Sequence, residues 1–138
     1  MGLERFRSAH ERDYAIALQE IKAGRKQSHW MWYIFPQILG LGSSADAVYY
    51  AIQDWDEASR YWADPVLSDH MKEICGELLK LEGSIEWILG YPDCLKLCSC
   101  MTLFWLVTGE PLFEDVLDQF YGGERDSRTI ELLLRKED

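Results

Sequence analysis

The segment from Gly24 to Gln37, called here the Gly24–Gln37 motif, concentrates side chains that bind ligands or exchange protons. Its charged, polar and aromatic members are Arg25, Lys26, Gln27, Ser28, His29, Trp30, Trp32, Tyr33, Phe35 and Gln37. Aromatic residues at this density usually belong to a protein core, but here they adjoin groups that bind anions or transfer protons. The combination indicates a ligand-binding site at the edge of the buried core.

His29 is the candidate catalytic residue, because a hydroxyl precedes it directly and Lys26 lies three positions before it. An imidazole in this setting could act as a general base or as a neutral donor to a bound oxyanion. The alternative is a structural histidine that donates one ring nitrogen to a backbone carbonyl where the Gly24 turn enters a helix at Trp30. The sequence leaves both interpretations open.

These residue types suit a small anionic ligand of the nucleotide or phosphate type. Lys26 and Lys96 would hold the anionic group, and Trp32 would stack on a ring. Gln37 either closes the same cavity or satisfies a turn. The candidate ligand-binding residues are Lys26, Ser28, Trp32, Gln37, Lys96 and Thr102, and the sequence does not decide whether the site is catalytic.

A second hypothesis is a non-catalytic helical interaction module in which the aromatic residues of the motif form the core. On a helix, Trp30 and Ile34 would share one face, and Trp32 and Phe35 another. Both faces are difficult to bury in a two-layer fold. One of the two aromatic sets is therefore expected to line a pocket.

The net charge of the chain limits the kinds of molecule that it is expected to bind. The 138 residues carry a formal net charge of −10, which disfavours nucleic-acid polymers and anionic membranes because the summed field repels phosphates. Residues 1–30 nevertheless have a balance of +2, and the remainder has −12. Positive potential near the motif favours a small anion over a long polyanion.

The four cysteines are expected to be buried free thiols. Cys94 and Cys98 would share a helix face from which Cys100 points away, so these three and Cys75 do not suit a four-thiolate zinc site. We expect no metal and no cofactor.

Residues 1–20 are amphipathic and charged, without the apolar run of a secretory signal, and no run reaches the length of a membrane span. A cytoplasmic location with reduced thiols is the expectation.

Helical periodicity and helix-capping residues dominate the rest of the chain, and no convincing period-2 alternation appears. We predict one all-α domain over residues 1–138. Ser44, after the glycine-rich loop 40–44, is placed to cap a helix. The other expected helices are one ending before Gly24, one that an Asp54–Glu57 capping box opens and that runs to Ala63, one from Pro65 to Glu82 with Asp64 as its cap, a short one over 84–89, one over 94–107 with Asp93 as its cap, one over 111–121 and one after the Asp126 cap.

The segment from Cys94 to Val107 is apolar nearly all round, which predicts the central helix of a bundle. Lys96 and Thr102 lie six residues apart in it and therefore on different sides. A lysine at the start of such a helix either extends its amine to solvent or points into a polar cavity.

The sequence also resembles a known bacterial family, domain of unknown function 1810. The resemblance lies in Gly24-x-Lys26-x-Ser28-His29-Trp30-Met31-Trp32-x-x-Phe35-Pro36-Gln37, Gly40-Leu41-Gly42, Tyr50-Ala51-Ile52, Lys96-Leu97-x-Ser99-x-Met101-Thr102-Leu103-Phe104, and Gly122 through Asp126 to Thr129. It implies an all-α, globin-like arrangement of helices and no assured activity. Asp64, where the family pattern leads us to expect His, and Cys100, where it leads us to expect Ser, depart from the resemblance.

Overall fold

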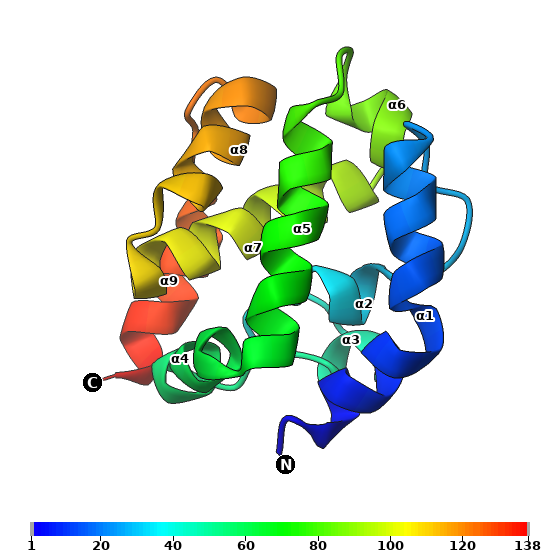
Figure 1. Cartoon of the computed structure of the whole chain (residues 1–138). Helices are drawn as coiled ribbons and strands as arrows, with labels where there is room; N and C mark the ends of the chain where they lie inside the picture. Colours follow the sequence, from blue (N-terminus) through cyan, green and yellow to red (C-terminus); the bar gives the residue numbers. More distant parts are fainter. Residues whose placement is uncertain (1, 138) are drawn as a thin grey trace.

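In the computed structural model, which describes residues 2–137, the chain forms nine α-helices (Figure 1). They are α1 (Glu4–Lys22), α2 (Met31–Ile34), α3 (Ala45–Tyr49), α4 (Trp55–Ala63), α5 (Pro65–Leu79), α6 (Ile85–Leu89), α7 (Asp93–Thr108), α8 (Pro111–Tyr121) and α9 (Ser127–Lys136). Within the described residues the only extended pairing is an isolated bridge between Ile38 and Ile52. The all-α prediction is confirmed, whereas a globin-like arrangement stays a prediction.

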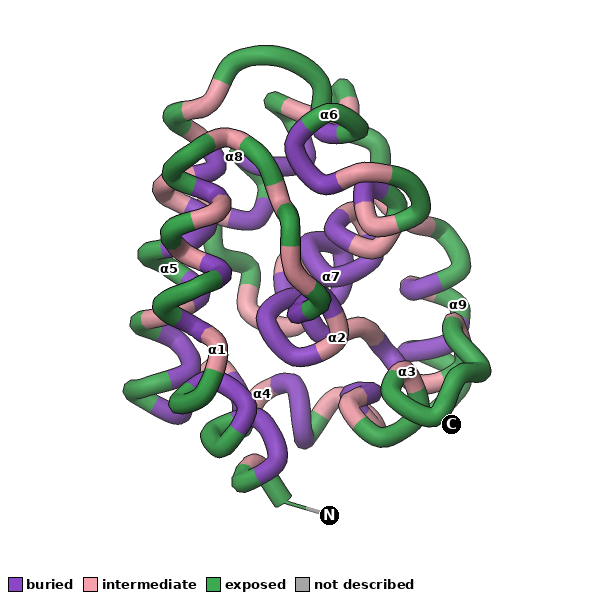
Figure 2. The backbone as a smooth tube through the Cα atoms, turned by 90° about the vertical axis from the view of Figure 1, so that its right-hand side faces the viewer, coloured by how far each residue is buried: buried purple, intermediate pink, exposed green. Residues whose placement is uncertain are grey.

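Helix α7 is the central element, as its sequence predicts. It packs against α4, α6, α8 and α9 and crosses behind α5 in Figure 1. Figure 2 shows it as the most continuously buried helix of the chain. An apolar helix in this position needs neighbours on most of its sides, and the surrounding helices supply them.

Local capping chemistry sets most helix starts where the sequence predicts them. The Asp54 carboxylate accepts the backbone N–H of Glu57 at 2.9 Å, and Asp126 caps α9 in the same way through Thr129. Helix α5 begins at Pro65 as predicted but ends at Leu79 rather than at Glu82. The backbone N–H groups of Lys80 and Leu81 bond three residues back, and this tighter turn ends the α-helix before Gly83.

A buried ion pair fastens the start of α1 to α4. The guanidinium of Arg5 contacts both carboxylate oxygens of Glu57, at 2.7 and 3.2 Å, and also donates to the carbonyls of Tyr49 and Ala51. Both charged side chains are almost fully buried, and each has several hydrogen bonds, which is what makes burial of a charge tolerable. This pair positions the segment that joins α3 to α4.

No helix in the described part of the chain is both long and apolar enough to cross a membrane.

Candidate functional site

The first half of the Gly24–Gln37 motif is organised by one carboxylate on α1. Glu20 accepts the backbone N–H groups of Gln27 and Ser28, the Ser28 hydroxyl and the indole N–H of Trp30, at 2.5 to 2.9 Å. Burial alone would raise the pKa of Glu20, but these donors outweigh it and lower the pKa to about 2. The Ser28 hydroxyl is therefore engaged in holding the loop.

Most aromatic residues of the motif belong to the core. Trp30, Tyr33 and Phe35 are buried, whereas Trp32 is only partly buried. The predicted pairing of Trp32 with Phe35 on one helix face is wrong, because α2 ends at Ile34 and Phe35, which follows the helix with a non-helical backbone, is fully buried in the core. Trp32 is the aromatic residue of the motif that reaches a pocket.

The pocket beside Trp32, called here the Trp32 pocket, has a volume of about 330 Å³. Three separate segments meet in it: α2 with the residue after Pro36, the glycine-rich loop with the start of α3, and the first turn of α7. Its lining residues are Trp32, Gln37, Leu41, Gly42, Ser43, Ser44, Ala47 and Lys96. Three predicted ligand-binding residues, Trp32, Gln37 and Lys96, are thus brought together.

A backbone hydrogen bond, a close approach at a glycine and a helix cap hold the chain segments around the Trp32 pocket in place. Ile52 donates its N–H to the Gln37 carbonyl at 2.8 Å, which fixes the chain just after the motif. A side chain at position 42 would place its Cβ 2.7 Å from the Cβ of Ala47, so only glycine allows the loop to approach α3 this closely. Ser44 caps α3 as predicted, accepting the Ala47 N–H at 3.1 Å. These contacts shape the part of the pocket wall that the glycine-rich loop and the start of α3 form.

A shared carboxylate links the two predicted lysines. Asp93 lies with Oδ2 at 2.9 Å from Lys26 Nζ and Oδ1 at 3.3 Å from Lys96 Nζ. Each ammonium also lies near an indole ring, Lys26 at 5.2 Å from the centroid of Trp30 and Lys96 at 5.9 Å from that of Trp32. Lys26 does not line the Trp32 pocket, but it shares the Asp93 carboxylate with Lys96, which does.

His29 and Thr102 lie elsewhere. His29 is exposed and is not among the residues that line the Trp32 pocket. Its backbone carbonyl accepts the hydroxyl of Tyr33 at 3.2 Å. Thr102 is fully buried: its hydroxyl donates to the Cys98 carbonyl at 2.8 Å and accepts the backbone N–H of Asp126 at 2.9 Å. Thr102 thereby connects α7 to the start of α9.

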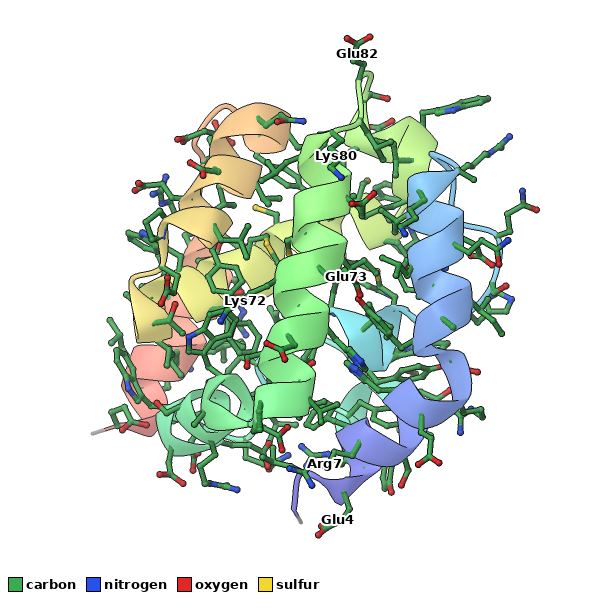
Figure 3. All side chains as sticks on the ribbon, in the orientation of Figure 1. Glu4, Arg7, Lys72, Glu73, Lys80 and Glu82 are labelled. Atoms are coloured by element: carbon green, nitrogen blue, oxygen red, sulfur yellow. The ribbon has the colours of Figure 1, made fainter. Side chains whose placement is uncertain are left out.

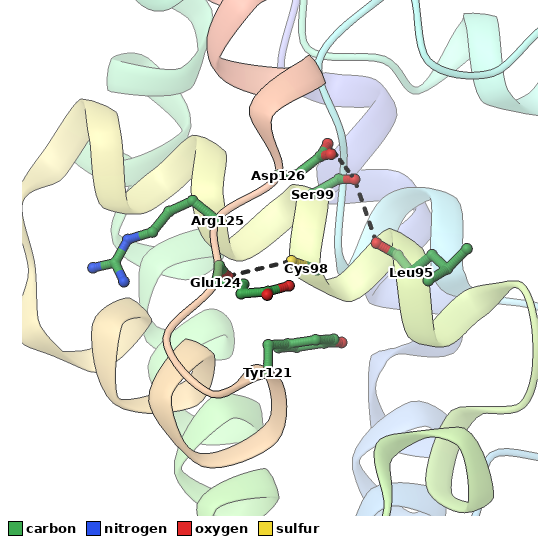
Figure 4. A pocket seen from close by; sticks show the side chains of 7 residues that line it. All are labelled: Leu95, Cys98, Ser99, Tyr121, Glu124, Arg125 and Asp126. Atoms are coloured by element: carbon green, nitrogen blue, oxygen red, sulfur yellow. Dashed lines mark hydrogen bonds between the residues drawn. The ribbon is translucent and has the colours of Figure 1, made fainter.

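A second pocket, of about 360 Å³, lies between α7 and the loop that joins α8 to α9 (Figure 4). Asp126 Oδ2 accepts the hydroxyls of Ser99 and Thr129, at 2.9 and 2.5 Å. Burial raises the pKa of the Cys98 thiol to about 11, which makes a thiolate nucleophile scarce at neutral pH. Asp126 thus serves to cap α9, while Arg125 pairs with Glu114 and the Tyr121 hydroxyl donates to the Cys94 carbonyl.

A pair of histidines that sequence reasoning did not predict lies between α1 and α5. His10 Nδ1 and His70 Nδ1 lie 2.9 Å apart, and the ring of Tyr14 stacks on that of His70 with centroids 3.6 Å apart. The Tyr14 hydroxyl donates to Glu73, which projects from α5 towards α1 in Figure 3. Burial lowers the pKa of His10 to about 4. This network holds α1 and α5 together rather than lining a pocket.

The thiols are free in the structure, with Cys75, Cys94 and Cys100 buried and Cys98 partly buried. Over residues 2–137 no three His, Cys, Asp or Glu side chains come together in an arrangement that could hold a metal ion.

Comparison with known proteins identifies the family. A family model described as protein of unknown function (DUF1810) matches residues 1–133. The chain belongs to this family. It is 45% identical to the conserved hypothetical protein Rv1873 from Mycobacterium tuberculosis, whose crystal structure at 1.38 Å superposes with a TM-score of 0.93 over 96% of each chain. No curated protein matches the chain at a significant level.

The two positions at which this DUF1810 chain departs from the expected pattern have structural roles. Asp64 caps α5 by accepting the N–H groups of Val66 and Leu67, at 3.0 and 3.1 Å, and pairs with Arg7. Cys100 is fully buried in α7. Neither residue lines the Trp32 pocket.

Proposed function

We propose that this protein binds a small anionic ligand with a planar ring in the Trp32 pocket. The observation that carries the proposal is the sharing of Asp93 between Lys26 and Lys96. One carboxylate neutralises only one of two ammonium groups, so a positive charge is left beside the pocket. An anionic ligand at Lys96 would compensate it.

The rest of the lining fits a ligand of modest size. A volume of about 330 Å³ is near the lower limit of ordinary ligand pockets, roughly 300 Å³, and suits one ring with one small anionic group. Trp32, Leu41 and Ala47 offer apolar contact. The Gln37 amide and the hydroxyls of Ser43 and Ser44 offer hydrogen bonds that would orient the ligand.

A thermal-shift screen over nucleotides, nicotinamide compounds and sugar phosphates tests the proposal. A true ligand at a hundredfold excess over its Kd stabilises the fold by about 2.7 kcal/mol. We expect Lys96→Ala and Trp32→Leu to lose this stabilisation. Lys72→Ala is the matched control, because Lys72 on α5 also lies near an indole ring, 5.3 Å from the centroid of Trp62, but does not line the pocket. Equal ligand shifts in Lys96→Ala and Lys72→Ala would refute the assignment.

A non-catalytic interaction module is the second candidate, and two observations favour it. The motif aromatics Trp30, Tyr33 and Phe35 are core residues, and three large apolar side chains around the turn from α6 to α7 are more than half exposed: Trp87 (63%), Tyr91 (77%) and Leu95 (55%). Exposed Trp and Tyr are frequent in protein interfaces. The absence of any ligand shift in the screen would favour this function over a ligand site.

A further inference from the structure

We infer that the Trp32 pocket selects anionic groups with a single negative charge over doubly charged groups of the same shape, and that Asp93 sets this preference. The inference rests on the proposed function of the pocket and adds the charge class of its ligand.

The first step is the charge of the Lys26–Asp93–Lys96 cluster. Asp93 contacts both ammonium groups, and among the described residues no other carboxylate lies within 4.0 Å of either lysine. Two positive charges and one negative charge leave the cluster at +1. A singly charged ligand group at Lys96 makes the site neutral, whereas a doubly charged group leaves it at −1.

The second step is burial. The side chains of Lys26 and Asp93 are 9% and 18% exposed, and that of Lys96 is 31% exposed. Removing an ion from water costs a free energy that grows with the square of its charge, whereas attraction to a fixed +1 cluster grows only linearly. The net charge of −10 over the whole chain further opposes a second negative charge. At equal shape, the monoanion is favoured.

The third step identifies Asp93 as the residue that determines the preference. It begins α7, one turn before Lys96, and it balances both lysines at once. Asp93→Asn keeps the size of the side chain but removes its charge, which changes the cluster from +1 to +2. The preference of this variant should move towards a doubly charged group.

Two probes of matching shape test the inference by isothermal titration calorimetry at pH 8. Phenyl sulfate carries one negative charge, and phenyl phosphate, which has the same ester linkage and tetrahedral group, is close to doubly charged because its second pKa is about 6. We expect the wild type to bind phenyl sulfate about tenfold more tightly than phenyl phosphate, and Asp93→Asn to bind phenyl phosphate at least as tightly as phenyl sulfate. Asp115→Asn, an exposed position on α8, makes the same change in net charge and should keep the wild-type ratio.

A second variant covers the case in which Asp93→Asn does not fold, as judged by far-UV circular dichroism. Lys26→Met removes a charge that does not line the pocket and leaves Asp93 paired with Lys96 alone. Affinity for phenyl sulfate should then fall about tenfold. The inference would be overturned if Lys26→Met bound the singly charged probe with the affinity of the wild type. It would also be overturned if the ratio of the affinities for the two probes were the same in the wild type, Asp93→Asn and Asp115→Asn.

Failure of the inference is distinguishable from failure of the proposed function. If neither probe binds, charge selection is refuted, but the ligand site stands as long as another ring-bearing anion in the thermal-shift screen depends on Lys96 and Trp32. If the whole screen fails, both proposals fall.

Discussion

The indole N–H of Trp30 lies 2.9 Å from Oε1 of Glu20, and so joins a core tryptophan to the carboxylate that holds the loop before it. Removal of the Glu20 charge should therefore affect both the loop and the packing of Trp30. Glu20→Gln is expected to lower the free energy of unfolding by about 1–3 kcal/mol, because several donors lose an ionised acceptor. Urea denaturation measures this, and Glu11→Gln, an exposed position on the same helix, should cost less than about 0.5 kcal/mol. Equal costs would show that the network adds nothing.

Stability should fall in mild acid because of His10. Burial lowers the folded-state pKa of His10 to about 4 from 6.5, so the unfolded chain takes up a proton that the folded chain refuses. The stability that neutral His10 contributes is fully present above pH 6.5 and is lost as the pH falls towards 4. The loss amounts to about 2 kcal/mol at pH 5. Urea denaturation at pH 7 and pH 5 should show a smaller loss for His10→Gln than for the wild type. The exposed control His29→Gln should keep the wild-type loss, and an equal loss in all three proteins would contradict the prediction.

His29→Ala should leave both the fold and ligand stabilisation nearly unchanged. The side chain is exposed and lies outside the Trp32 pocket, and such substitutions usually change stability by less than about 0.5 kcal/mol. The measurement is the thermal shift of His29→Ala with the best ligand of the screen, compared with that of Lys96→Ala. A ligand shift lost in His29→Ala would return this histidine to the site.

Thr102→Val should destabilise the protein without affecting ligand binding. The substitution leaves the backbone N–H of Asp126 without its acceptor, at an expected cost of about 1–3 kcal/mol. Thr108 is a matched control: its hydroxyl also donates to the carbonyl four residues back and accepts a backbone N–H, but at the exposed end of α7. Chemical denaturation should show a clearly smaller loss for Thr108→Val. A ligand shift that disappears in Thr102→Val alone would indicate a binding role instead.

Features that depend on neighbouring residues were predictable from the sequence. The caps at Ser44, Asp54, Asp64 and Asp126 and the start of α8 at Pro111 all follow from side chains within one helical turn. The apolar composition of α7 likewise predicted its central place. In each case the interaction that decides the structure is local.

Features that depend on distant residues were not predictable. Asp93 was expected only as the cap of a helix that starts at Cys94, and this is wrong, because Asp93 is the first residue of α7 and makes no capping hydrogen bond. Its contact with Lys26 forms across 67 positions of the chain. The same holds for Arg5 with Glu57, where a capping pattern concealed a buried ion pair. The separation of Trp32 from Phe35 depends on α2 ending after one turn, which the periodic pattern alone could not show.

The contact between His10 and His70 makes two identical side chains chemically different. A carbonyl oxygen can only accept, so the 2.8 Å contact of His10 Nε2 with the Tyr33 carbonyl places the proton of neutral His10 on Nε2. Its Nδ1 must then accept, and His70 must carry its own proton on Nδ1. The hydrogen bonds therefore run in one direction, from α5 through α1 to α2, and the two rings are fixed as opposite tautomers.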